Sequence, residues 1–294
     1  MSEMEKRPAS QTEPTQWSPY GFTLQAGDPS ALIAAGHAAV QDEGSQLAAL
    51  ALAGVPVDGP DRLWLDMCAG PGGKSRLLHG LAMSAGAHLV AADVHPHRAT
   101  LVKEALARTS HPGTMPAHRG STGEEGRFPA AFRRTAGLNL PLQSEATVLV
   151  ADGRRSPWRD GAFDRVLVDV PCSGLGALRR RPEARWRKSE SDLPALAALQ
   201  RDLLRSALEA CRPGGVVGYV TCSPVPAETR DVVTAVAGSA AGVEVLDAPA
   251  VLSAVPGVRS ASPLFAQLWP HGHGTDAIFI ALLRRGTHIA EREA

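Results

Sequence analysis

The sequence has few of the features that would define a function class directly. Its 294 residues include only four cysteines, Cys68, Cys172, Cys211 and Cys222, and none of them forms a CxxC pair. Without that spacing or a paired histidine cluster, we expect no metal site. Unpaired cysteines without a secretory leader favour a reducing, cytoplasmic location. No apolar run approaches the roughly 18 residues of a membrane helix, so we expect no membrane association.

The sequence also has no net charge. Lysine and arginine total 30, and aspartate and glutamate total 30. Overall charge therefore gives no argument for a polyanionic partner, which only a local basic patch could bind. Hydrophobic residues make up 44% of the chain, an ordinary value for a globular protein. The length supports one large α/β domain with a small appendage.

Segments typical of strands and helices alternate along most of the chain. The predicted strands are 63–67, 88–92, 147–150, 163–169, 216–221, 243–246 and 277–283. The predicted helices are 74–84, 96–108, 193–211 and 227–237, with a further one inside 35–52 that Asp42 or Ser45 would cap. Apolar strands separated by helices predict a parallel, doubly wound sheet, and so an α/β, Rossmann-like fold.

Two stretches interrupt this alternation. Residues 1 to about 20 are rich in Glu, Gln, Pro, Ser and Thr, which predicts disorder. Residues 110–146 carry proline, glycine and scattered arginine without a clear period. A loop this long inside a compact domain is either functional or disordered.

Two cysteine dipeptides each close a short apolar run. Pro171-Cys172 follows the run 163–169, and Thr221-Cys222 follows the run 216–220. If these strands are parallel neighbours, both thiols leave the same edge of one sheet, a strand spacing of roughly 4.8 Å apart. Open α/β sheets bind ligands at this edge, so the pair predicts covalent chemistry in a cleft.

A glycine-rich loop, LDMCAGPGGKS, follows the first strand and opens a helix. Its glycines allow close approach of a ligand, and the helix N-terminus offers free N–H groups. A plain turn and a triphosphatase phosphate loop are the alternatives, but Cys68 stands where the phosphate loop requires its first glycine. Asp93 and Asp152 end the next two strands and suit a ribose and an adenine amino group. Together they predict a nucleoside pocket.

These motifs resemble those of the RsmB/Nop2/Sun family, the S-adenosylmethionine-dependent RNA cytosine-C5 methyltransferases. The matching segments are DMCAGPGGKS, ADGR, DRVLVDVPCSGLGALRRRPEARWR, TCSPVPAE, QDEGSQ at 41–46 and GTDAIFIALLRR at 274–285. The resemblance is strongest to the bacterial 16S rRNA (RsmB-type) branch. It implies a class I methyltransferase fold with a seven-stranded, mostly parallel sheet.

The resemblance also implies a division of the chain. Residues 35–285 would be the catalytic domain, and 286–294 a polar tail. Residues 1–34 would be a flexible N-terminal segment or the remnant of an RNA-binding subdomain. The NusB-like N-terminal domain of the bacterial rRNA enzymes is lacking, Val170 stands where alanine is usual, and 110–146 is longer than the usual connection. The chain would then be a truncated form, or would recognise RNA without that domain.

The matched positions imply roles for individual residues. Cys222 matches the nucleophile, Cys172 the cysteine that helps product release, and Asp169 the acid at the cytosine edge. The residues expected to bind the cofactor S-adenosylmethionine are Cys68, Ala69, Gly70, Pro71, Gly72, Gly73, Lys74, Asp93, Arg98, Asp152 and Asp169. A thiolate added to C6 of cytosine makes C5 nucleophilic, which divides one difficult step into easier ones.

A basic stretch directly follows Cys172. Its members are Arg179, Arg180, Arg181, Arg185, Trp186, Arg187 and Lys188. Positive charge beside an aromatic ring predicts an RNA phosphate-and-base surface, and a solvated charged face is the alternative. The target base would have to be unpaired or flipped to reach the thiols.

We therefore expect a monomeric RNA cytosine-C5 methyltransferase with 16S rRNA as substrate. A tRNA cytosine-C5 methyltransferase and a non-catalytic RNA-binding assembly factor remain as alternatives. A DNA cytosine methyltransferase would be expected to carry a Glu-Asn-Val motif, which is absent.

Overall fold

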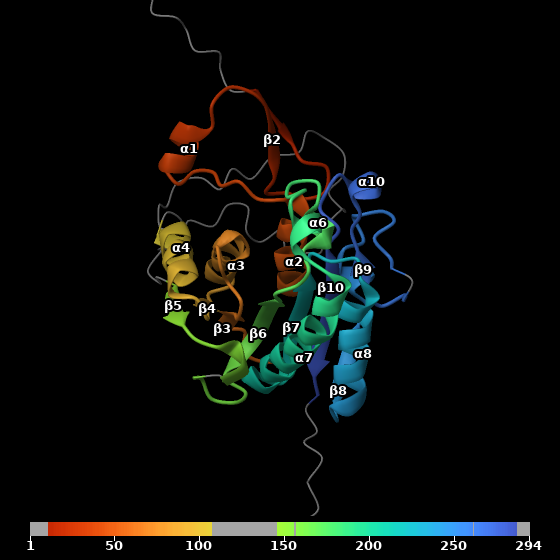
Figure 1. Cartoon of the computed structure of the whole chain (residues 1–294). Helices are drawn as coiled ribbons and strands as arrows, with labels where there is room; N and C mark the ends of the chain where they lie inside the picture. The colour runs from red at the N-terminus through yellow and green to blue at the C-terminus, as the bar shows by residue number, and fades with distance from the viewer. Residues whose placement is uncertain (1–10, 108–145, 156, 261, 287–294) are drawn as a thin grey trace, which may run out of the picture.

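The structure is a computed structural model, and it describes residues 11–107, 146–155, 157–260 and 262–286. A central sheet is covered by helices on both faces (Figure 1). One face carries α2 (Glu43–Gly54), α3 (Gly73–Ser84) and α4 (Pro96–Ala107), and the other carries α7 (Leu193–Ala210) and α8 (Arg230–Ser239). None of the described helices is long and apolar enough to cross a membrane.

The sheet follows the order β5-β4-β3-β6-β7-β10-β8, and the short β9 pairs with β10. Its strands are β3 (Leu63–Asp66), β4 (His88–Asp93), β5 (Thr147–Val150), β6 (Phe163–Asp169), β7 (Cys211–Thr221), β8 (Val243–Leu246), β9 (Ala266–Gln267) and β10 (Phe279–Arg285). The pairs among β5, β4, β3, β6 and β7 are parallel, and β10 pairs antiparallel with β7, β8 and β9. The predicted Rossmann-like sheet is confirmed.

Several element boundaries differ from the prediction. Strand β7 begins at Cys211, which pairs with Phe163, so the preceding helix ends at Ala210. Helix α8 begins at Arg230 because Pro226–Glu228 form a separate 3-10 turn and Thr229 has a non-helical backbone. Asp42 caps α2, as expected, by accepting from the Gly44 amide at 3.0 Å.

The N-terminal part of the described chain is a hairpin of β1 (Gln11–Pro14) and β2 (Phe22–Ala26), followed by α1 (Ser30–Ala34). The buried Trp17 indole donates to the His273 carbonyl at 3.1 Å, and the Trp17 amide donates to Glu43 at 2.6 Å. Predicted disorder is therefore wrong for residues 11–20, because Trp17 packs against the domain. Residues 1–10 and 108–145, where disorder or a long loop was also predicted, lie outside the described residues.

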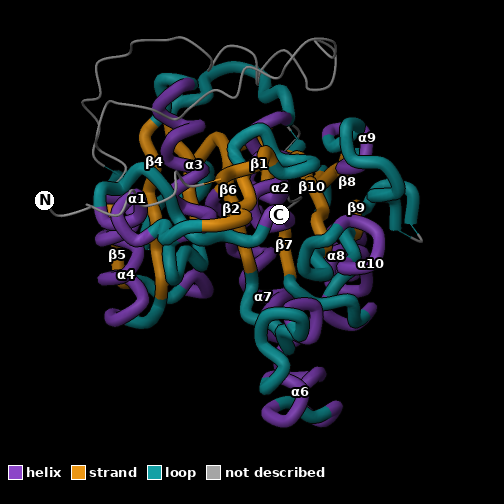
Figure 2. Tube along the Cα trace, turned by 90° about the horizontal axis from the view of Figure 1, so that it is seen from above, coloured by secondary structure: helices purple, strands orange, loops and turns teal. Residues whose placement is uncertain are grey.

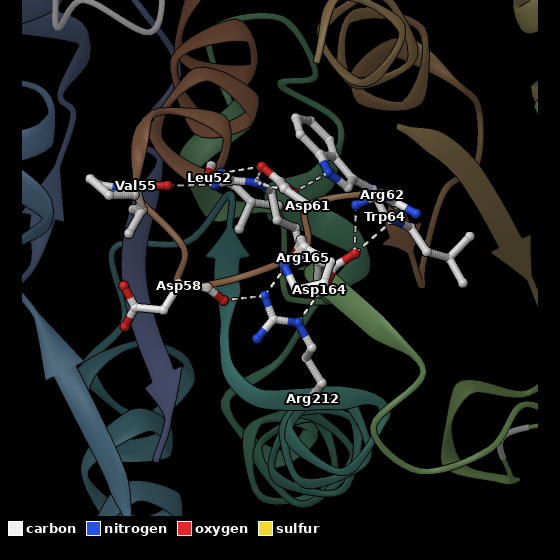
Figure 3. Close-up of polar contacts among 12 residues, drawn as sticks. Leu52, Val55, Asp58, Asp61, Arg62, Trp64, Asp164, Arg165 and Arg212 are labelled. Atoms are coloured by element: carbon white, nitrogen blue, oxygen red, sulfur yellow. Dashed lines mark hydrogen bonds and ion pairs between the residues drawn. The ribbon is translucent and has the colours of Figure 1, made fainter. Parts of the chain in front are cut away.

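The polar cluster of Figure 3 joins α2 and β3 to β6 at the amino end of the sheet. Arg165, only 4% exposed, donates to both Asp61 carboxylate oxygens at 2.7–3.0 Å. It also donates to the Leu52 and Val55 carbonyls, each at 2.7 Å, and lies 5.0 Å from the centre of the Trp64 ring. One buried guanidinium therefore holds the end of α2 against two neighbouring strands.

We expect Arg165→Ala to lower the free energy of unfolding by about 3 kcal/mol, because it leaves Asp61 and two carbonyls without their donor. Urea unfolding measures the change. The control is Arg205→Ala, which removes an exposed pair with Asp202 and should change stability by less than about 0.5 kcal/mol. Equal losses in the two variants would show that the cluster adds nothing beyond a surface ion pair.

Candidate active site

A cavity of about 490 Å³ opens at the carboxyl edge of the sheet. Its lining comes from residues within 40–45, 66–74 and 169–188, together with Arg98, Cys222, Asp276 and Ile278. The segments 66–74 and 169–174 and Cys222 follow β3, β6 and β7, whose carboxyl ends share one edge because these strands are parallel. The structure therefore brings the glycine loop and both predicted cysteines into one cavity.

The two cysteines of the dipeptides lie in direct contact. Their sulfur atoms are 3.3 Å apart, because β6 and β7 pair in parallel with Asp169 opposite Val220. Either sulfur can donate in this contact. With the Cys172 thiol as the donor, the hydrogen bond lowers the pKa of Cys222, and the Lys74 ammonium acts in the same direction while burial and the Asp169 carboxylate oppose it. The same sulfur contact, with burial, raises the pKa of Cys172. The pair is therefore unequal, with Cys222 the more acidic thiol.

Lys74 connects the glycine loop to the predicted cytosine acid. Its ammonium donates to the Asp169 carboxylate at 2.7 Å and to the Ser45 hydroxyl at 3.2 Å. Burial favours the neutral amine, but the Asp169 carboxylate prevails and the pKa of Lys74 is raised. Lys74 was expected only as a cofactor contact, and the fold also makes it the charge partner of Asp169.

Asp93 supports the glycine loop from behind. Its carboxylate accepts from the amides of Gly70 at 3.0 Å and His95 at 2.9 Å, and Arg98 lies 3.6 Å away. Arg98 also donates to the Gly70 carbonyl. A Cβ at Gly70 would lie 2.5 Å from Asp93, so only glycine fits there. Arg98 lines the cavity, whereas Asp93 is buried beneath the loop and is not part of the lining.

Asp152, like Asp93, is a predicted cofactor acid that does not line the cavity. It accepts hydrogen bonds from the Arg154 amide and guanidinium at 2.7–3.2 Å, which lower the pKa of its carboxyl. Its place beside an adenine stays a prediction.

Two polar side-chain atoms of cavity-lining residues are buried without a hydrogen-bond partner. They are the acceptor Asp66 Oδ1 and the donor Gln41 Nε2. An ammonium and a carboxylate on one ligand would satisfy both, and the methionine end of S-adenosylmethionine carries these groups. The residues present therefore fit this cofactor. Asp66 lies in the glycine-rich motif and Gln41 in the QDEGSQ segment, so the sequence pointed to both regions. Only the folded structure shows that these two atoms are buried without a hydrogen-bond partner.

The predicted RNA-binding run divides into three groups. Arg179 donates to Asp42 at 2.9 Å, and Arg180 holds both oxygens of the buried Asp276. Arg180 lines the cavity and Arg179 does not, but both pair with buried carboxylates of residues in the cavity wall. The members that line the cavity besides Arg180 are Arg181, Arg187 and Lys188.

The remaining two members lie on α6 (Ala184–Arg187), which projects from the body of the protein (Figure 2). The Arg185 guanidinium lies 5.1 Å from the centre of the Trp186 ring, and Trp186 is 82% exposed. An exposed indole ring beside the cationic side chains that line the cavity is suited to stacking against a base.

This fold and this cavity define a class I S-adenosylmethionine-dependent methyltransferase. The chain also matches the sequence model of the family described as 16S rRNA methyltransferase RsmB/F, over residues 54–115 and 130–284. The chain belongs to this family.

Individual relatives agree with this family. The chain is 46% identical over 276 residues to a Mycobacterium tuberculosis protein whose name gives methyltransferase as a provisional assignment, covering 92% of this chain and 52% of that protein. It is 33% identical to ribosomal RNA small subunit methyltransferase B of Pseudomonas putida, covering 91% of this chain and 52% of that protein. The chain thus spans about half the length of these curated relatives.

Solved structures share the fold. NSun6 of Pyrococcus horikoshii, crystallised with SFG, has a TM-score of 0.67 and 22% identity, covering 91% of this chain and 58% of that one. A methyltransferase homologue from the same organism also has a TM-score of 0.67 and 22% identity. The match covers 94% of this chain and 79% of that one.

Burial raises the pKa of Asp66 from 3.8 to about 7. The folded protein therefore holds a proton that the unfolded chain releases, and the resulting stability is present at low pH and is lost as the pH rises from about 4 to about 7. Asp66→Asn removes this titration. Between about pH 5 and about pH 8, its free energy of unfolding should gain about 2 kcal/mol relative to wild type.

Urea unfolding of both proteins across this pH range measures the difference. Asp202→Asn, an exposed carboxyl, serves as the control and should run parallel to wild type. A constant difference between Asp66→Asn and wild type would mean that Asp66 is already ionised at low pH.

Proposed function

We propose that this chain methylates C5 of cytosine in RNA, with 16S rRNA as the substrate, through a covalent bond between Cys222 and C6 of the base. The observation that carries the proposal is the 3.3 Å contact between two sulfurs of unequal acidity, in a cavity shared with the glycine loop. The names of the ribosomal RNA relatives support rRNA as the substrate class.

Cys222 begins the reaction. Its thiolate adds to C6 of the cytosine, and electron density moves to C5. S-adenosylmethionine, when bound, supplies the electrophilic methyl group that C5 attacks. The Cys172 thiol and Lys74 both favour the Cys222 thiolate, so a larger fraction of Cys222 is ionised than of an ordinary cysteine at the same pH.

Asp169 orients the base. Lys74 fixes its carboxylate at 2.7 Å, and the side chain remains 29% exposed to the cavity. A carboxylate accepts from the exocyclic amino group that cytosine carries and uracil lacks. A uracil would instead present a carbonyl oxygen to a carboxylate, and this repulsion favours cytosine.

Cys172 assists release. The C5 proton passes to solvent water and its electron pair forms the C5–C6 double bond, while the bond between C6 and the Cys222 sulfur breaks and that electron pair returns to sulfur. The Cys172 thiol, which its raised pKa keeps protonated, donates to that sulfur and stabilises the departing thiolate.

The test uses labelled S-adenosylmethionine with total rRNA and, in parallel, total tRNA. We expect Cys222→Ser to abolish methyl transfer and Cys172→Ser to accumulate a covalent protein–RNA complex, visible on a denaturing gel. Cys211→Ala is the control, because Cys211 is buried in the core away from the cavity.

Each outcome separates the alternatives. Full activity in Cys222→Ser would overturn the nucleophile assignment. Transfer to tRNA alone would make tRNA the substrate. No transfer by wild type to either RNA, with retained RNA binding, would favour the non-catalytic assembly factor.

Arg181 and Arg187 are expected to contact RNA phosphates. Changing either to alanine should reduce the slope of log Kd against log salt by about one. Filter binding of an rRNA fragment at several salt concentrations measures the slope. Arg205→Ala, on an exposed face of α7, is the control. Wild-type slopes in both cavity variants would exclude these arginines from the RNA path.

A further inference from the structure

A buried carboxylate lies behind the two cysteines. Glu228, at the end of the 3-10 turn Pro226–Glu228, has no exposed surface. Its oxygen Oε1 accepts from the Ser173 amide at 2.7 Å and from Gln200 at 3.2 Å. Its other oxygen accepts from the hydroxyls of Ser173 at 2.5 Å and Ser223 at 2.6 Å. One side chain thus accepts four hydrogen bonds.

Two of the three residues that donate to the Glu228 carboxylate are the immediate neighbours of the two cysteines. Ser173 follows Cys172, and Ser223 follows Cys222. The same two hydroxyls are 3.3 Å apart, which matches the separation of the two sulfurs. Glu228 therefore connects the two loops that carry the thiols, one residue beyond each of them.

A second set of contacts holds Glu228 itself. The Tyr219 hydroxyl donates to the Glu228 carbonyl at 2.7 Å, and Gln200 donates to the Pro171 carbonyl at 2.9 Å. Pro171 directly precedes Cys172, so Gln200 fixes the same loop from its other side. The whole arrangement is buried between α7 and the ends of β6 and β7.

Charge makes this arrangement unusual. The described partners of the Glu228 side chain are two hydroxyls, an amide side chain and a backbone N–H, and no ion pair is found for it among the described residues. Burying a carboxylate without a cation costs several kcal/mol, part of which its hydrogen bonds offset. An ionised carboxylate is acceptor-only, so it forces both serine hydroxyls to donate and fixes their orientation.

We propose that Glu228 is a positioning residue that holds the two cysteine loops at the separation where the Cys172 thiol donates to the Cys222 sulfur. The geometric part of this proposal is independent of methyl transfer, and its catalytic consequence rests on the proposed function. Without the carboxylate, the loops separate, the sulfur contact lengthens and the Cys222 thiolate loses its donor.

The test compares Glu228→Gln with Glu228→Asp and wild type. Glutamine keeps the shape, but its amide nitrogen cannot accept, so half of the four donors lose their partner. Aspartate keeps the charge on a shorter side chain. Asp164→Asn is the matched control, because Asp164 is a buried carboxylate that accepts from Arg212, Arg62 and Leu63 at the opposite end of the sheet.

The rate at which iodoacetamide alkylates Cys222, followed against pH by peptide mass spectrometry, measures the fraction of Cys222 present as thiolate. The titratable groups that act on Cys222 include Cys172, Asp169, Lys74, Asp276 and Arg180, and every variant retains them. We expect Glu228→Gln to raise the apparent pKa by about one unit, which lowers the rate near neutral pH by about 10-fold. Glu228→Asp should recover part of this loss, and Asp164→Asn should match wild type.

The rate of oxidation by diamide depends on the distance between the two sulfurs. Diamide takes two electrons and two protons from the thiol pair, which forms a Cys172–Cys222 disulfide. We expect this disulfide to form about 10-fold more slowly in Glu228→Gln, which corresponds to about 1.4 kcal/mol in the barrier. In the methyl-transfer assay, kcat should fall at least about 10-fold while KM for S-adenosylmethionine stays within about two-fold.

If Glu228→Gln does not fold, Ser223→Ala removes a single link and should show a smaller change in the same direction. Wild-type alkylation and disulfide rates in the folded variants would overturn the proposal, as would equal changes in Asp164→Asn. A third outcome separates the two proposals. If Glu228→Gln changes the alkylation and disulfide rates but the wild type transfers no methyl group, the positioning role stands and only the proposed function is overturned.

Discussion

The parallel pairing of β6 and β7 is the constraint on which the candidate active site depends. It sets Asp169 opposite Val220, so the two chains leave the sheet side by side and their cysteines meet with sulfurs 3.3 Å apart. Every further feature of the site uses this edge. The carboxylate of Glu228 bridges the two loops from behind, and the glycine loop after β3 reaches the same cavity because β3 pairs with the other side of β6.

The charges at this edge suit a cationic methyl donor and an anionic polymer in adjacent regions. Asp66 and Asp169 line the cavity, Asp93 lies beneath the glycine loop, and Lys74 is engaged by Asp169. Burial strengthens the electrostatic interactions of all these groups, since the interior screens charge less than water does. The cationic side chains Arg181, Arg187 and Lys188, which lie in α6 or close to it in the chain, line the same cavity.

The members of a single run of basic residues have different surroundings, which the composition of the run does not reveal. Arg179 is held by Asp42, 137 positions away, and Arg180 by Asp276, 96 positions away. Both arginines balance buried or nearly buried carboxylates, so they support the wall of the cavity. Arg181 and Arg187 line the same cavity, and the proposed RNA contact falls to them. The distinction depends on partners that only folding brings close.

The sequence by itself determined the alternation of strands and helices, the glycine loop and the two cysteine dipeptides, because apolar periodicity and turn residues act between close neighbours in the chain. The tertiary structure alone decided which distant groups meet. It docked Trp17 on His273, paired Lys74 with Asp169, left Asp152 away from the cavity and placed Glu228 behind both thiols. Such contacts depend on strand register and side-chain packing, which no local pattern encodes.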